Sequence, residues 1–271
     1  VMAEELGPFD AHFLVPAFFE VGRITRHSIH YLQSDGKEIP VHETEFARDS
    51  VFGFHHSYLP DYVAEKTRGR IPAVTVKRFL LADVRAGVLP QLLALSGNTC
   101  VVVDAEIQDD LNRFAADLFR AVGAGKRFLF RGAASLLTAL ADLPAQPVSP
   151  DEMVKYVRGG KPGAVLVGSH VPKTTQQIDE LLRQPGIIRI EVDVHRLPQD
   201  HIALLDEVVA QVEIAHASDQ TPVIFTSRTE RSFSDQASRL AFGEQVSSFL
   251  IDVVRRLPKT LGFLVSKGGI T

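Results

Sequence analysis

The sequence has little cysteine, no long apolar run and no excess of positive charge, and each shortage excludes a class of protein. Cys100 is the only cysteine among 271 residues, so no disulfide can form within the chain. This fits a reducing compartment, and we expect a cytoplasmic location. No apolar run approaches the roughly 20 residues that span a bilayer. The net charge of −4 does not favour binding to nucleic acid or to an anionic membrane, so we expect neither as a partner.

Several catalytic motifs are missing as well. The chain has no Gly-x-Ser-x-Gly elbow, which leaves hydrolase chemistry without support. It also lacks the Gly-x-x-x-x-Gly-Lys-Ser/Thr loop of P-loop nucleotide-binding proteins. Five of the histidines in the first quarter match no zinc spacing with a fixed carboxylate or cysteine partner, and we predict no metal site among them: His27, His30, His42, His55 and His56.

What is present is an alternation of short apolar runs with longer helical patterns, typical of α/β proteins with mostly parallel sheets flanked by helices. The strands expected in the first half are residues 12–17, 73–80, 99–103 and 127–130, with helices at 84–95, 109–122 and 133–140. The strands expected in the second half are 164–167, 187–192, 222–226 and 261–266, with helices at 174–183, 201–215 and 235–256. The long polar stretch 23–70 is either functional or an inserted subdomain.

A proline-rich break divides the two halves. Residues 143–150 carry three prolines, and a glycine-rich stretch follows at 159–163. Such segments cannot continue a helix and behave as semi-rigid linkers. We therefore expect two domains, at 1–145 and 164–271, joined by a linker at 146–163.

Open parallel sheets bind ligands at the carboxyl ends of their strands, so the residues after each strand are the candidates for a site. In the second half, Gly168 and Ser169 follow a strand, Lys173 adds a positive charge, and Thr174 or Thr175 can cap the next helix. A glycine turn, a hydroxyl and a helix amino end all favour a phosphate. The alternative is a plain strand-to-helix connection with a threonine cap.

The last strand of the second half ends in a second glycine turn. The residues after it are Gly268, Gly269, Ile270 and Thr271. Adjacent glycines allow the backbone to approach a nucleotide closely, although a flexible terminal turn explains them equally well. Arg228, after another strand, can meet a phosphate or belong to a solvated loop.

The first half offers its own candidates. Arg23, with Gly22 and Thr25 beside it, is placed to grip a carboxylate with its two-pronged guanidinium. Asp104 and Arg131 end two further strands, where either can bind a ligand or cap a structural turn.

Taken together, these turns resemble the four-carbon acid sugar kinase family, whose members often carry the label Hrp-dependent type III effector. Nothing in the sequence supports a role as a secreted effector. The segments that carry the resemblance are residues 16–25 (PAFFEVGRIT), 44–49 (TEFARD), 65–69 (EKTRG), 130–135 (FRGAAS), 167–176 (VGSHVPKTTQ), 226–228 (TSR) and 267–271 (KGGIT).

The resemblance implies a function and a separate role for each domain. Family members transfer the γ-phosphate of ATP, with Mg²⁺, to the terminal hydroxyl of threonate, erythronate or a 3-oxo-tetronate. An amino-terminal domain binds the acid, a carboxyl-terminal domain binds the nucleotide, and the active site lies in the cleft between them. By position, the nucleotide-binding candidates are Gly168, Ser169, Gly268, Gly269, Ile270 and Thr271. The acid-binding candidates are Gly22, Arg23, Thr25 and Arg131.

Departures from the family leave parts of this expectation open. The Asp-Asp-x-Thr-Gly turn and the Lys-x-Asp-Ser-Thr-Leu-Arg-Gly segment of the substrate pocket are absent. With Val1 before Met2 and a turn at the end of the chain, this suggests missing sequence at both ends. Asp104 is the one weak candidate for a catalytic base. The function expected is an ATP-dependent kinase of a four-carbon sugar acid, and the alternative is a non-catalytic nucleotide or sugar-acid binding protein on the same scaffold. We leave a homodimer open as the assembly.

Overall fold

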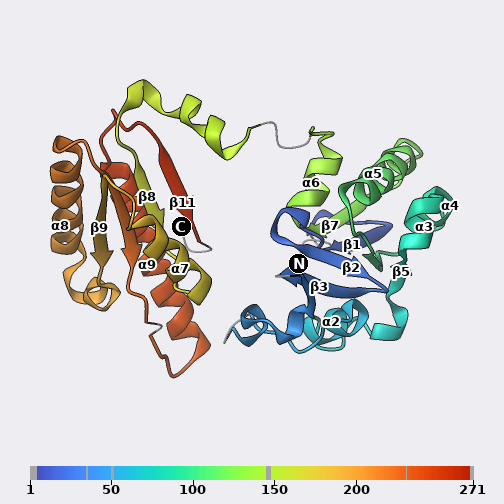
Figure 1. The fold of residues 1–271 in the computed structure, drawn as a ribbon. Coiled ribbons are helices and arrows are strands. Elements are labelled where there is room, and N and C mark those ends of the chain that lie inside the picture. The colour runs from blue at the N-terminus through green and yellow to red at the C-terminus, as the bar shows by residue number, and fades with distance from the viewer. Residues whose placement is uncertain (1–4, 35, 50–51, 145–147, 230, 269–271) are drawn as a thin grey trace. The chain divides into compact units, whose positions relative to one another are not determined.

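The fold is described from a computed structural model that covers residues 5–34, 36–49, 52–144, 148–229 and 231–268. The chain divides into two compact units, Val1–Ala145 and Gln146–Thr271, and each is described by itself. Each unit is a parallel sheet flanked by helices (Figure 1). The predicted fold class, two α/β domains with mostly parallel sheets, is thereby confirmed.

The sheet of unit 1 has the strand order β5-β6-β1-β7, and all three neighbouring pairs are parallel. Its strands are β1 (Ala11–Val15), β5 (Lys77–Phe79), β6 (Thr99–Val103) and β7 (Phe128–Gly132). Alternate residues of each strand face opposite sides, so Phe13 and Val101 join one core, and Leu14 and Val102 join the other. Burial on both faces explains why these strands read as continuous apolar runs.

Helices cover both faces of this sheet. They are α2 (Leu59–Lys66), α3 (Leu81–Ala86), α4 (Leu89–Leu93), α5 (Gln108–Gly123) and α6 (Ala134–Leu140). Residues of α3, α4, α5 and α6 pack in the core with Phe13, whereas α2 packs on the other side with Leu14 (Figure 1). The single helix expected at 84–95 is wrong. Gly87 has φ +101 and ends α3, and Asp117 Oδ2 accepts the Val88 and Leu89 amides at the start of α4.

The polar stretch after β1 folds into a small antiparallel sheet inserted before β5. Its strands are β2 (Arg23–Arg26), β3 (Ile29–Ser34) and β4 (Lys37–Pro40), in the order β2-β3-β4. Short 3₁₀ helices flank it: η1 (Phe19–Val21), η2 (Val41–Glu43), η3 (Glu45–Arg48) and η4 (Ala73–Thr75). The structure thus has a 3₁₀ helix at residues 73–75, where the sequence predicts the start of a strand.

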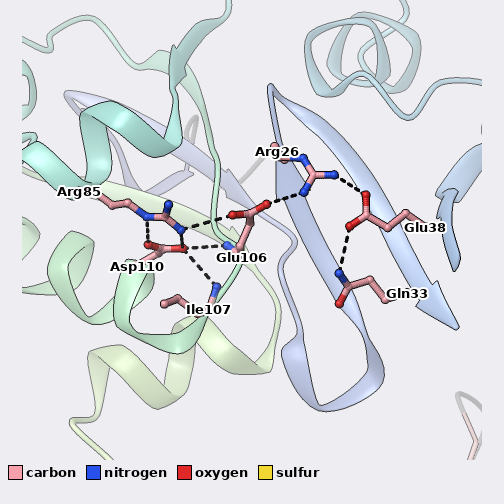
Figure 2. Close-up of polar contacts among 7 residues, drawn as sticks. All are labelled: Arg26, Gln33, Glu38, Arg85, Glu106, Ile107 and Asp110. Carbon is pink, nitrogen blue, oxygen red and sulfur yellow. Dashed lines mark hydrogen bonds and ion pairs between the residues drawn. The ribbon is translucent and has the colours of Figure 1, made fainter. Parts of the chain in front are cut away.

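A chain of charged groups ties this small sheet to the main one (Figure 2). Arg26 of β2 pairs with Glu38 of β4 and, at 2.7 Å, with Glu106. Arg85 bridges Glu106 and the buried Asp110 at the start of α5, at 3.4 and 2.7 Å. Thr25 and Ala105 also exchange backbone hydrogen bonds of 2.8 and 2.9 Å. The position of β2 is therefore set by the carboxyl end of β6.

Gly22 is required where the chain enters β2. Its φ is +73, and a Cβ there would lie 2.4 Å from the Gln33 carbonyl oxygen. We expect Gly22→Ala to lower the free energy of unfolding by about 3 kcal/mol, from φ strain and displacement of β3. The matched control is Gly36→Ala, because Gly36 has φ +72 and nothing within 4 Å of the added Cβ. Denaturant melts of both variants test this, and an equal loss would show that only the φ matters.

Unit 2 repeats the parallel arrangement with strand order β11-β8-β10-β9. Its strands are β8 (Ala164–Val167), β9 (Ile187–Val192), β10 (Thr221–Thr226) and β11 (Leu264–Lys267). Its helices are α7 (Pro172–Leu181), α8 (Leu197–Ala217) and α9 (Gln236–Arg256), with 3₁₀ helices η5 (Pro150–Tyr156), η6 (Arg158–Gly160) and η7 (Val194–Arg196). Leu166 and Ile224 pack with α8 and α9, and Val167 and Phe225 pack with α7 on the other face (Figure 1).

The elements of unit 2 lie close to their predicted places. The last strand begins at Leu264 instead of residue 261, and α8 begins at Leu197 instead of residue 201. Among the described residues, no helix is both long enough and apolar enough to cross a membrane.

Candidate functional site

Unit 1 holds a cavity of about 220 Å³ beside the carboxyl ends of β1 and β7. Its lining residues come mostly from the inserted segment: Leu14, Pro16, Arg23, His30, Val41, Thr44, Phe46, Phe54, His56, Leu59, Tyr62, Arg131, Gly132 and Ala133. At about 30 Å³ for each water molecule, this volume holds roughly seven waters. A small ligand fits this volume.

Arg23 is the half-buried cation of this cavity. Its guanidinium lies 5.1 Å from the centre of the Phe46 ring, in cation–π geometry. Within the described part of the chain, no carboxylate lies in ion-pair range of it. Burial without such a partner lowers the pKa of Arg23 from its ordinary value, although an arginine remains charged at neutral pH. A carboxylate bound in the cavity would supply the missing counter-charge.

His30 stands beside Arg23 as a neutral polar group. It is 6% exposed, and its Nδ1 lies 3.0 Å from the Thr25 hydroxyl. Burial, and then the positive charge of Arg23, lower the pKa of His30 to about 4. His30 therefore stays uncharged at neutral pH and adds hydrogen-bonding capacity to the cavity without positive charge.

Arg131 is the second cation of the cavity and is exposed. It lies near the carboxyl end of β7, the neighbour of β1, and its guanidinium lies 5.8 Å from the centre of the Tyr62 ring. None of the carboxylates in the described ranges pairs with it. The structure thus brings Arg23 and Arg131, both predicted as acid-binding residues, to one cavity.

The other first-half candidates lie outside the lining. Gly22 shapes the entry to β2, and Thr25 is fully buried behind the cavity, against His30. Asp104 is 1% exposed, and its Oδ1 accepts the Ser28 amide at 2.8 Å. It therefore anchors the turn between β2 and β3, where His27 and Ser28 have positive φ. This contact accounts for Oδ1 alone, because Oδ2 is buried without a hydrogen-bond partner among the described residues.

Asp104 makes a testable pH prediction. Burial raises the pKa of its carboxyl to about 6, whereas an unfolded aspartate titrates near 3.8. Between these values the folded state binds more protons, so this group's contribution to stability falls as pH rises. We expect Asp104→Asn, which keeps an acceptor and removes the charge, to be at least about 1 kcal/mol more stable than wild type at pH 8.

That advantage should shrink as pH falls from 8 to 4, by up to about 3 kcal/mol. Urea melts at both pH values measure it. Comparing variant with wild type is essential, because His30 contributes the opposite slope in the same range: its lowered pKa makes stability fall as pH drops below about 6.5. A constant difference across pH would contradict the assignment to Asp104.

In unit 2, a polar cluster lies at the carboxyl ends of β8 and β11. The Gly168 amide donates to the Lys267 carbonyl at 3.1 Å, and the Ser169 hydroxyl lies 3.2 Å from that of Thr174. Lys267 Nζ donates to the same Thr174 hydroxyl at the start of α7. Gly268 has φ +127, and a Cβ there would lie 2.8 Å from the Ser169 amide nitrogen. Two glycine turns, far apart in sequence, therefore touch each other.

Arg228 completes the cluster from the end of β10. Its guanidinium donates to the Ser169 carbonyl at 2.7 Å and to the Thr175 hydroxyl at 2.8 Å. Burial lowers the pKa of Arg228, against smaller opposing effects of Asp179 and Glu191. Within the described ranges, neither Arg228 nor Lys267 has a carboxylate in ion-pair range. Two cations beside the amino end of a helix are typical of a phosphate-binding edge.

Three predicted nucleotide-binding residues, Gly269, Ile270 and Thr271, lie outside the described residues. The predicted Lys173 lies in the first turn of α7, and the structure gives it no contact with the cluster. Among the described residues, no three His, Cys, Asp or Glu side chains come together to hold a metal ion.

With this geometry in place, comparisons with known proteins identify the family. A family model described as a sugar-binding N-terminal domain matches residues 1–140, and one described as a nucleotide-binding C-terminal domain matches residues 164–271. The chain belongs to the four-carbon acid sugar kinase family. The cavity thus lies within the sugar-binding domain of this family and the polar cluster within its nucleotide-binding domain.

One solved structure supports the fold, and two others match with TM-scores below 0.5. A Salmonella typhimurium LT2 protein described as a "putative tRNA synthase" shares 19% identity and a TM-score of 0.58, over 100% of this chain and 62% of its own. A Haemophilus influenzae protein shares 15% identity and a TM-score of 0.49, over 99% of this chain and 62% of its own. A Bordetella bronchiseptica protein shares 23% identity and a TM-score of 0.36, over 96% of this chain and 57% of its own. The chain therefore spans less than two thirds of each, and no curated protein sequence matches it.

Sequence reasoning missed several lining groups. In the sequence, His30 stands out only as a possible metal ligand, and nothing marks the rings of Phe46 and Tyr62 as lining groups. Lys267 stands out only as part of a turn. An aromatic residue close to an arginine in the sequence of one loop can indicate a cation–π contact. Only the fold shows which ring and which arginine are in contact.

Proposed function

We propose that this chain is the acid- and nucleotide-binding part of an ATP-dependent kinase that phosphorylates the terminal hydroxyl of a four-carbon sugar acid. One observation carries the proposal. In each unit, positively charged side chains that have no carboxylate partner among the described residues lie at the carboxyl edge of the parallel sheet. Family membership, with one domain described as sugar-binding and the other as nucleotide-binding, supports the same assignment.

In unit 1, the cavity supports binding of the acid. Arg23 would hold the carboxylate, and the neutral His30 would meet a hydroxyl of the ligand. Four-carbon acids match the volume of about 220 Å³, and Val41 and Leu59 add apolar surface to the lining. The absence of Asp and Glu from the described lining favours an anionic ligand over a neutral sugar.

In unit 2, the polar cluster supports binding of the nucleotide phosphates. Lys267 and Arg228 would neutralise phosphate charge, and the Ser169 hydroxyl would donate to a phosphate oxygen. Gly268 lets the backbone of β11 pass close to Ser169, which keeps the edge open to a ligand.

Phosphoryl transfer requires few reactive side chains. Phosphoryl transfer depends mainly on positioning and on neutralising charge. Magnesium bound with the nucleotide would share that neutralisation. Among the described residues, no three His, Cys, Asp or Glu side chains come together to hold the ion. We assign no catalytic base, because Asp104 is buried away from the cavity lining.

The test uses the complete protein with ATP, Mg²⁺ and a panel of tetronates and 3-oxo-tetronates, with ADP release as the readout. We expect release to depend on one of these acids. ADP release that no acid stimulates would contradict the kinase assignment. If calorimetry then showed nucleotide or acid binding without turnover, the non-catalytic alternative would replace it.

A further inference from the structure

The cavity of unit 1 contains twice the positive charge that one carboxylate requires. Arg23 and Arg131 both line it, and no described lining residue is Asp or Glu. The remaining polar side chains of the lining are His30, Thr44, His56 and Tyr62, and none of them is a carboxylate. His30 is neutral at physiological pH, and the Thr44 hydroxyl is engaged with the Val41 carbonyl at 2.6 Å. A carboxylate held by one arginine leaves the other without a counter-charge.

The two guanidiniums differ in burial, which distinguishes an inner end of the cavity from an outer end. Arg23 is half-buried, whereas Arg131 is exposed near the end of β7. Each lies over an aromatic ring, at 5.1 Å from the centre of Phe46 and 5.8 Å from the centre of Tyr62. Stacking on a ring uses the face of a guanidinium and leaves its N–H edge for a ligand oxygen.

From these observations we infer that the cavity is a two-anion site, which takes a small acid with an anionic group at each end. The inner Arg23 binds the carboxylate, and the outer Arg131 binds the anionic group at the opposite end. This inference rests on the proposed function, in which the cavity holds the acid. In that reaction the second anion is the phosphate of the product, so Arg131 is a positioning residue for the end of the acid that is phosphorylated.

A consequence is that the cavity prefers product to substrate. The phosphorylated acid engages both arginines with charge-assisted hydrogen bonds, whereas the unphosphorylated acid engages only Arg23 in this way. A four-carbon dicarboxylate such as tartrate imitates the product in carrying two anions. We therefore expect tartrate and the 4-phosphorylated acid to compete with the substrate acid for this cavity.

The experiment is calorimetric titration of the chain with threonate, 4-phosphothreonate and tartrate, without nucleotide. We expect both two-anion ligands to bind about tenfold more tightly than threonate at low salt. Arg131→Gln should remove this advantage, and Arg131→Lys should keep part of it. The matched control is Arg113→Gln, an exposed arginine of α5 that pairs with Asp109 and does not line the cavity.

The outcomes separate the inference from the proposed function. Equal affinities for threonate and the two-anion ligands would overturn the two-anion site and leave acid binding intact. An advantage that survives in Arg131→Gln would also overturn it, because Arg131 would then not be the second contact. Failure of all three ligands to bind would overturn the acid-binding assignment itself. Raising the salt concentration should reduce the advantage, since the outer arginine is exposed.

Discussion

Arg23→Gln should weaken binding of the sugar acid by at least about a hundredfold. The substitution removes the half-buried guanidinium that has no carboxylate partner among the described residues. Removing a charge-assisted, two-pronged hydrogen bond from a partly desolvated site costs roughly 2–5 kcal/mol of binding free energy. Calorimetric titration with threonate measures the change in affinity, and nucleotide affinity should stay the same.

Stability should not follow the decrease in binding. Burial already disfavours the charge of Arg23, as its lowered pKa shows, so the substitution relieves desolvation while it removes the cation–π interaction with Phe46. We expect the free energy of unfolding to stay within about 1 kcal/mol of wild type. Arg113→Gln again serves as the control. Normal threonate affinity in Arg23→Gln would remove Arg23 from the acid site.

Gly268→Ala should have a comparable effect on the nucleotide. The residue has φ +127, and its new Cβ would press within 2.8 Å of the Ser169 amide nitrogen. Since Ser169 is also held by Arg228, the backbone of β11 must move away from β8. We expect ATP affinity to fall about a hundredfold and unit 2 to become less stable by about 2–3 kcal/mol. Fluorescent-nucleotide titration and thermal melts measure the two effects.

A matched variant separates steric from conformational causes. Gly186 of the same unit has φ +76 and open space around its added Cβ, so Gly186→Ala carries only the conformational cost. It should bind ATP normally. If Gly268→Ala also bound ATP normally, the glycine turn of β11 would not belong to the nucleotide site. Threonate affinity should stay unchanged in both variants.

From the sequence, the strands of both parallel sheets could be predicted more accurately than the strands of the inserted segment. Burial on both faces makes strands such as β6 and β8 short apolar runs, which are easy to recognise. The helix expected at 84–95 was wrong because its break depends on Asp117, a residue of another helix that accepts the amides of the next turn. The segment 23–70 gave no periodic signal, because its short strands are stabilised by ion pairs and backbone bonds to Ala105 instead of a broad apolar face.

Residues of the candidate site were predictable from the sequence only where the type and position of a single residue indicate its role. Arg23 and Arg131 stood out as cations near strand ends, and the structure places both at one cavity. Asp104 has the right residue type and position, but the sequence does not show that the β2–β3 turn covers it. The close approach of Gly268 to Ser169 depends on β11 lying beside β8, which is a property of strand order.

The insertion between β1 and β5 has a consequence for how such proteins diversify. Nine of the residues that line the cavity lie between Arg23 and Tyr62, in one continuous stretch of chain. The parallel sheet contributes little more than the ends of β1 and β7. Ligand preference can therefore change by exchange of this one segment while the core around Phe13, which contains none of its residues, stays unchanged. Transplanting the segment between relatives would test whether it determines the ligand preference of the cavity.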